Sequence, residues 1–103
     1  MNIQKMMKQA QRMQDDLAAA QADLATKTLE ATAGGGKVTV TASGAGDILK
    51  IKIDPSVVDP TDVEVLEDLV LAGVQKAQEE ARELAASDMK KITGGMNIPG
   101  LSI

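Results

Sequence analysis

The sequence predicts an α+β subunit in which a three-stranded antiparallel meander lies between two long helices, in the order α-β-β-β-α. Within residues 28–53, apolar and polar residues alternate in three short runs that glycine-rich segments separate. Residues 1–26 contain no glycine or proline, and residues 60–93 carry apolar side chains at helical spacing. A chain of 103 residues is long enough for one such domain, so we assign residues 1–103 to a single domain.

The first predicted helix, residues 1–26, carries an apolar seam with a seven-residue repeat. The seam consists of Ile3, Ala10, Leu17 and Leu24 in one heptad position and Met6, Met13 and Ala20 in the other. A seam of this kind packs either on the subunit's own sheet or along another long helix, and the spacing does not choose between them. At ~1.5 Å per residue the helix is longer than the adjoining sheet, so we expect its N-terminal end to project.

The meander has one apolar face. The residues expected on it are Leu29, Ala31 and Ala33 in the first run, Val38, Val40 and Ala42 in the second, and Leu49, Ile51 and Ile53 in the third. Residues 34–36 and 44–46 supply the turns, where glycine can take the positive φ that other residues avoid. Across the meander and the second helix, we expect the core and a dimer interface to use Val38, Val40, Leu49, Ile51, Leu66, Leu69 and Val70.

The second predicted helix, residues 60–93, begins at a strong capping signal. Asp59 suits the N-cap position and Pro60 suits the first helical position. The carboxylates that follow stabilise the positive end of the helix dipole, which explains the acidic middle of the chain without a metal ion. Glycines after residue 93 end the helix, and we expect residues 94–103 to form a flexible tail.

Composition excludes several functional classes. The chain has no Cys and no His, which removes disulfides, thiolate or imidazole metal ligands and the commonest general base. Residues 34–37 lack the remaining parts of a phosphate-binding loop, so no nucleotide site is predicted. The chain has no Phe, Tyr or Trp. It therefore lacks the aromatic side chains on which most proteins that bind single-stranded nucleic acids or RNA stack the bases. We therefore expect no enzyme activity, no cofactor, no small-molecule substrate and, without a long apolar run, no membrane partner.

The formal net charge is −4, but cations gather at the two ends of the chain. Lys5, Lys8 and Arg12 follow each other at i, i+3 and i+7, which places them on one stripe of the first helix with no carboxylate between them. Lys90 and Lys91 form a second set near the end of the second helix. Three charges on a helix are often only a solvated face, whereas their position on a projecting end also suits an anionic partner.

The predicted core is thin, because the chain is short, rich in alanine and without aromatic residues. A three-stranded sheet also leaves two edges unpaired. Both features favour a homodimer over a marginally stable monomer.

A set of short segments resembles the YbaB/EbfC family of nucleoid-associated proteins. The segments are residues 7–11 (MKQAQ) with Met13 and Gln14, the glycine turn before residues 38–40 (VTV), residues 53–55 (IDP), residues 66–70 (LEDLV) and residues 94–100 (GGMNIPG). The resemblance covers nearly the whole chain, and the set is specific although no single piece is. It implies an α-β-β-β-α subunit and a homodimer joined through the sheets, with long helices projecting like the arms of tweezers. Gly73 stands where the family usually has alanine, which suggests looser helix packing in this chain.

The resemblance also implies bacterial DNA binding, in the organisation of the nucleoid or in gene regulation, and hence a cytoplasmic, nucleoid-associated location with double-stranded DNA as partner. The family's DNA contacts lie on the first helix and on the far part of the last one. Carried over to this chain, they fall on two sets of cations and the amides beside the first set, namely Lys5, Lys8, Arg12, Lys90, Lys91, Gln4 and Gln9. The alternative from another class is a protein-interaction module, such as a small chaperone-like holdase or a DNA-repair adaptor, that grips a client through the Met-rich first helix.

Overall fold

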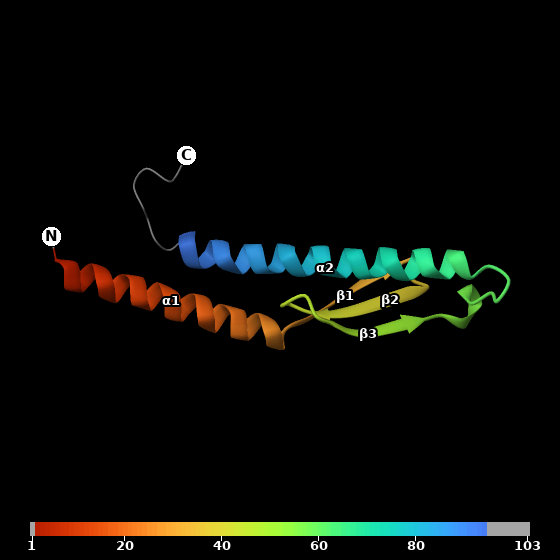
Figure 1. Ribbon diagram of the computed structural model, residues 1–103, viewed down its shortest axis with the longest axis horizontal. Coiled ribbons are helices and arrows are strands. Elements are labelled where there is room, and N and C mark those ends of the chain that lie inside the picture. Colours follow the sequence, from red (N-terminus) through yellow and green to blue (C-terminus); the bar gives the residue numbers. More distant parts are fainter. Residues whose placement is uncertain (1, 95–103) are drawn as a thin grey trace, which may run out of the picture.

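A computed structural model of the chain describes residues 2–94. Its elements are α1 (Ile3–Thr26), β1 (Thr28–Ala33), β2 (Val38–Ser43), β3 (Ile48–Ile53), the 3-10 turn η1 (Pro55–Val57) and α2 (Val63–Gly94). Figure 1 shows the sheet against the first half of α2, while α1 leaves the sheet and runs antiparallel to the second half of α2. The predicted α-β-β-β-α order of an α+β fold is confirmed. Apart from Gly94, which ends α2, the predicted tail lies outside the described residues.

The three strands form an antiparallel sheet in the order β1-β2-β3, and its first two strands match the predicted alternation. Ala31 lies opposite Val40 and Ala33 opposite Val38, so the expected inward residues meet across the ladder. Val38 and Val40 are fully buried, as predicted for the central strand. Apart from Leu24, every buried apolar residue is Ala or Val. The core within residues 2–94 is therefore as thin as the composition suggested.

Three consecutive glycines make the tight connection between β1 and β2 possible. Gly34, Gly35 and Gly36 have φ angles of 63°, 67° and 88°, a region that side chains with a Cβ rarely adopt. The backbone N–H of Lys37 donates to the carbonyl of Gly34 at 3.4 Å and closes the turn.

A bulge in β3 overturns one part of the predicted inward face. Ala42 lies opposite Ile48 and Thr41 lies opposite Lys50, so Leu49 is an extra residue in the ladder. The inward position that we expected for Leu49 belongs to Ile48, which packs against the core, whereas Leu49 is 57% exposed. The prediction that Leu49 faces inward is therefore wrong, because the extra residue puts Ile48 on the inner face while Ile51 and Ile53 keep their predicted register.

Ile51 has the predicted register but is not buried in the subunit. It lies opposite Val40, yet 41% of it is exposed. The reason is that α2 packs mainly over β1 and β2 and leaves β3 at an open edge of the sheet. Ile51 is thus a surface residue of the single subunit rather than a core residue.

Gly73 brings α2 close to the sheet. A Cβ at this position would lie 2.9 Å from Cγ2 of Val40, which is closer than a real Cβ contact allows. Ala77 and Ala81, which follow on the same face of α2, are also buried. Glycine at this position therefore goes with a close approach of helix and sheet, and the expectation of looser helix packing is wrong.

The start of α2 differs from the prediction by one turn. The Asp59 carboxylate accepts hydrogen bonds from the N–H and the hydroxyl of Thr61 at 2.9 and 2.7 Å. The hydroxyl and then the N–H of Thr61 lower the pKa of Asp59, because both favour the charged carboxylate. Asp59 therefore stabilises a separate turn before the helix, and α2 begins at Val63.

Candidate nucleic-acid interface

The helix α1 forms a projecting arm. Its seam packs against α2 only near the sheet, where Leu24 is buried and Leu17 and Met13 are half-buried. Ile3 and Met6, at the far end of the same seam, are 69% and 53% exposed. Figure 1 shows this end of α1 extending past the end of α2. The partner of the heptad seam within residues 2–94 is therefore α2 of the same chain, over about half of the seam.

The base of the arm is held by the turn between β2 and β3. The N–H of Gly44 donates to the carbonyl of Lys27 at 3.0 Å, directly after the end of α1. A Cβ on Gly44 would lie 2.6 Å from the carbonyl oxygen of Leu24. Glycine at this position therefore lets the last turn of α1 sit against the sheet.

An ion-pair bridge joins the same base to α2. The Lys27 Nζ lies 3.0 Å from Asp88 Oδ2 and 3.3 Å from Asp23 Oδ2. The hydrogen bond to Asp88, and then the one to Asp23, raise the pKa of Lys27 above its ordinary value. Lys27 and Asp88 are 61 positions apart in the chain. Their ion pair therefore ties the end of α1 to α2 and helps to set the direction of the arm.

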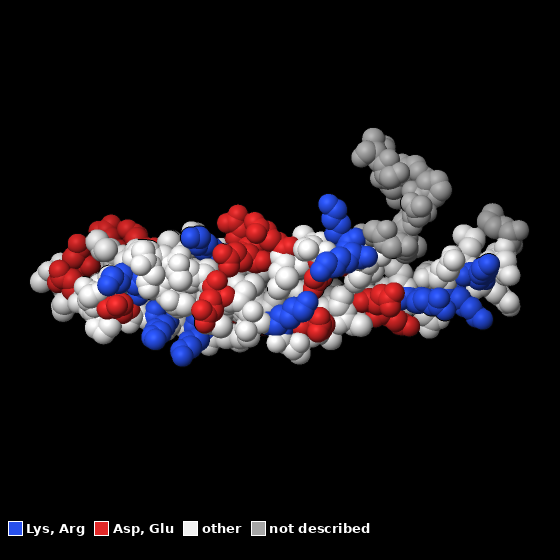
Figure 2. Space-filling view, turned by 180° about the vertical axis from the view of Figure 1, so that it is seen from behind, with Lys and Arg blue, Asp and Glu red and all other residues white. Residues whose placement is uncertain are grey.

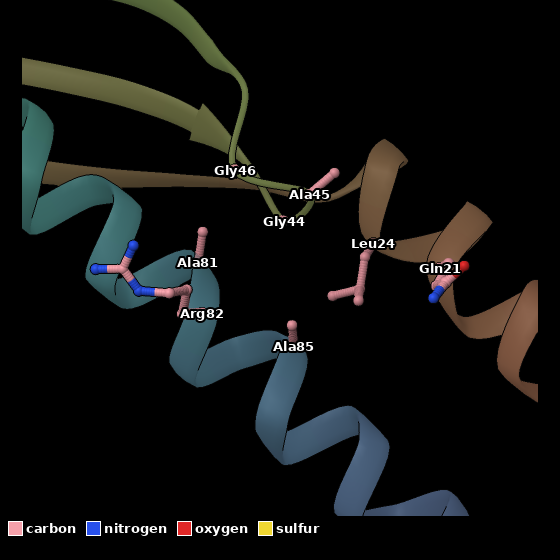
Figure 3. Close-up of a pocket in the computed structure, with 8 residues that line it drawn as sticks. All are labelled: Gln21, Leu24, Gly44, Ala45, Gly46, Ala81, Arg82 and Ala85. Atoms are coloured by element: carbon pink, nitrogen blue, oxygen red, sulfur yellow. The ribbon is translucent and has the colours of Figure 1, made fainter.

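A hollow of about 390 Å³ lies where α1, the turn after β2 and α2 meet. Figure 3 shows the side chains around it. It is lined by Gln21, Leu24, Gly44, Ala45, Gly46, Ala81, Arg82 and Ala85. The lining is mostly apolar, and its one cation, Arg82, directs its guanidinium along α2 and away from Leu24. Without a paired acid and base the hollow offers no catalytic arrangement, and we interpret it as part of the joint that holds the arm.

Substituting Gly44 by alanine should destabilise this joint. The new Cβ would overlap a backbone carbonyl, which cannot rotate away as a side chain would, so we expect a loss of about 1–3 kcal/mol. Thermal or urea unfolding would measure the loss. The neighbouring Ala45→Ser, at an exposed position, is the control and should leave stability nearly unchanged. Equal stability of Gly44→Ala and the parent would contradict the close contact.

The predicted basic stripe lies on the side of the arm that faces away from α2. Lys5, Lys8 and Arg12 are exposed, and at about 100° per residue they lie roughly opposite the seam that contacts α2. Among residues 2–94, no carboxylate lies within ion-pair distance of any of these three cations. Gln4 and Gln9 are exposed on either side of the stripe. Figure 2 shows the resulting group of blue side chains along the arm.

The two lysines of the second predicted set, Lys90 and Lys91, point in different directions. Asp88 faces α1, since it pairs with Lys27. At about 100° per residue, Lys90 then points roughly away from α1, whereas Lys91 lies nearer the α1 side. Both are exposed. Within one subunit, therefore, the structure does not bring Lys90 onto the face of the arm that carries the α1 stripe.

Acidic side chains lie on the outward side of α2. Glu64, Asp68, Glu79 and Glu83 are exposed and turn away from the apolar face that packs on the sheet. Figure 2 shows red groups along much of the α2 side of the molecule, with a few blue side chains among them. Over this length α2 thus carries an excess of negative charge on its outward side, which disfavours contact with a polyanion there.

Comparison with known proteins identifies the chain. The sequence profile of the YbaB/EbfC DNA-binding family matches residues 1–96. The chain belongs to this family. This YbaB/EbfC protein is 56% identical over 100 residues to a nucleoid-associated protein of Thermoanaerobacter pseudethanolicus, with 97% of this chain and 90% of the relative covered. It is 54% identical over 100 residues to one of Caldanaerobacter subterraneus, with the same coverage.

A solved structure supports the fold of this YbaB/EbfC chain. An uncharacterized protein of Helicobacter pylori superposes with a TM-score of 0.65 at 18% sequence identity, over 76% of this chain and 90% of that one. At this identity the likeness concerns the fold alone.

The family is named for DNA binding and not for an enzyme activity. Within residues 2–94 no group of three or more carboxylates is placed to hold a metal ion. Neither α1 nor the described length of α2 has a stretch apolar enough to cross a bilayer.

Proposed function

We propose that this YbaB/EbfC protein binds double-stranded DNA as a homodimer through its basic arms, and so organises the nucleoid or modulates gene expression in the bacterial cytoplasm. The observation that carries the proposal is the exposed stripe of Lys5, Lys8 and Arg12 on a projecting helix, without a carboxylate partner in residues 2–94. Cations in this arrangement suit the phosphates of a duplex, which supply most of the non-specific binding energy.

The stripe favours binding with little sequence preference. Lysine and arginine contacts to phosphate position a protein on the duplex but do not read the bases. Gln4 and Gln9 flank the stripe and can donate to phosphate oxygens or to base edges. A modest preference for a palindromic site would follow from the two-fold symmetry of a dimer.

An open apolar groove beside β3 supports the homodimer. The groove, of about 460 Å³, is lined by Ile53, Leu66, Glu67, Val70, Leu71 and Val74. Leu71 is 56% exposed, and Ile51 on the adjacent strand is 41% exposed. Large apolar side chains gathered along one groove favour a self-complementary contact with a second copy of the chain, since the subunit's own core is thin.

The homodimer would also bring the two sets of cations together. Within a subunit, Lys90 points away from α1 and so from the stripe. A duplex gripped between the arms of two subunits can meet the stripe of one arm and the α2 end of the other.

A salt titration of duplex binding tests the proposal. We expect the logarithm of the affinity to fall with the logarithm of salt concentration at a slope of roughly −4 to −7, and binding to be lost between ~0.05 and ~0.2 M salt. Fluorescence anisotropy with a labelled duplex of 24 base pairs would measure it. A slope near zero would contradict phosphate binding by the arms.

A protein-interaction module is the second candidate, and the exposed apolar end of the arm favours it. Ile3, Met6 and Met7 are 69%, 53% and 66% exposed, on the side of α1 opposite the basic stripe. Methionine side chains adapt to varied partners. Binding to a client through these residues would persist through ~0.5 M salt, which separates this function from phosphate binding.

A further inference from the structure

The outer face of the sheet carries a second group of cations. In β3, Lys50 lies opposite Thr41 and Lys52 lies opposite Thr39. Their neighbours Val38 and Val40 are buried on the α2 side, so the alternating residues point to the face away from α2. No sequence pattern marks these lysines as a site, because two charges in an edge strand are typical of ordinary solvated positions.

Lys50 and Lys52 are exposed and, unlike Lys27 and Lys37, pair with no carboxylate of the described residues. Across the sheet their rows continue through threonines, as Thr32–Thr39–Lys52 and Glu30–Thr41–Lys50. One carboxylate thus accompanies two lysines and three threonines. Lysine and threonine side chains both donate hydrogen bonds to phosphate oxygens.

This face and the basic stripe of α1 lie on the same side of the molecule. Each faces away from α2, and Figure 2 shows blue side chains along that side at both the sheet end and the arm end. Asp15, Asp16 and Asp23 lie between the two groups along α1. The side therefore offers two separate basic patches in line with each other, with the acidic surface of α2 behind them.

We propose that Lys50 and Lys52, together with the hydroxyls of Thr39 and Thr41, form a second phosphate-binding patch that extends duplex contact from the arm onto the outer face of the sheet. The inference rests on the proposed function. A helix of 24 residues spans ~36 Å and a strand of six spans ~20 Å. Figure 1 shows α1 and the sheet end to end, so a duplex along both would cover about 16 base pairs at ~3.4 Å each.

The groove proposed as the dimer interface strengthens this patch. The groove contains Ile53, which points to the α2 side of the sheet, and so it leaves Lys50 and Lys52 uncovered. A homodimer joined through this groove therefore carries four such lysines, two on each subunit.

Lysines on an edge strand can also serve only to prevent pairing with other sheets. That role predicts a change in assembly when they are removed, whereas phosphate binding predicts a change in the salt dependence of DNA binding. The two readings are therefore separable by experiment.

The test compares Lys50→Gln/Lys52→Gln with Lys37→Gln/Lys76→Gln, a control that removes the same charge from exposed lysines elsewhere. On a duplex of 24 base pairs, the first variant should make the salt slope shallower by up to ~3.6 per dimer, at ~0.9 per lost contact. Its affinity should fall about 10-fold or more below that of the control. Sedimentation velocity should give the same assembly for both variants and the parent.

Equal slopes for the two variants, with a parent that binds, would overturn the inference and leave the proposed function standing. Altered assembly of Lys50→Gln/Lys52→Gln without a shallower slope would assign the lysines to edge protection and also overturn it. If the unsubstituted protein binds no duplex, both the proposed function and this inference are contradicted.

Discussion

Replacement of Lys5, Lys8 and Arg12 by alanine is expected to abolish duplex binding at ~0.1 M salt while leaving the subunit folded and its assembly unchanged. The three side chains are exposed and make no ion pair within residues 2–94, so their removal takes nothing from the core. Alanine also keeps the helix, since its helix propensity is the highest of all residues. A homodimer would lose six cations, and six phosphate contacts change affinity about 10³-fold between 50 and 200 mM salt.

A mobility-shift or anisotropy titration would measure this effect, with circular dichroism as a check on the helices. The matched control is Lys37→Ala/Lys76→Ala/Arg82→Ala, which makes the same change of net charge at exposed positions away from the arm stripe. The control should retain most of the affinity. If both triple variants lose binding equally, net charge and not the stripe governs the interaction.

Leu71→Asp is expected to convert the proposed homodimer to a monomer at micromolar concentration. Leu71 is 56% exposed in the subunit, so a carboxylate there is solvated in the monomer and harmless to the fold. In the proposed interface the same carboxylate would be buried against Ile53 and Val70 of the groove without a cation, which costs several kcal/mol. Such a cost weakens dimerisation at least 100-fold.

Sedimentation velocity would measure the change, with Val65→Asp as its control. Val65 lies on the same helix and is 49% exposed, but it does not line the groove. This variant should remain a dimer. The monomer formed by Leu71→Asp should also bind DNA more weakly, because it carries half of the phosphate contacts. A dimeric Leu71→Asp would show that the interface lies elsewhere.

Much of the fold could be predicted because local patterns specify it. The seven-residue repeat of α1 and the alternation in β1 and β2 depend only on which side chains share a face. Val38 and Val40 were therefore expected in the core and are buried there. The basic stripe follows from the same helical geometry, and the side chains of Lys5, Lys8 and Arg12 are exposed on the projecting arm.

Other features arise from contacts between segments that no local pattern reveals. The bulge that puts Ile48 rather than Leu49 on the inner face of the sheet depends on how β3 pairs with β2. The direction of Lys90 depends on how α2 packs, which the Lys27–Asp88 bridge reveals. The close approaches at Gly44 and Gly73 are likewise known only once helix and sheet are placed together.

The sequence by itself determined the order of the elements, the family and the exposed stripe of α1, because periodicity and short motifs are properties of neighbouring residues. Only the tertiary structure decided that α1 packs on its own α2, that an apolar groove is left open beside β3 and that Lys50 and Lys52 share a side of the molecule with the arm stripe. Each of these depends on the packing of elements distant in the chain, and many sequences with the same local pattern could pack differently.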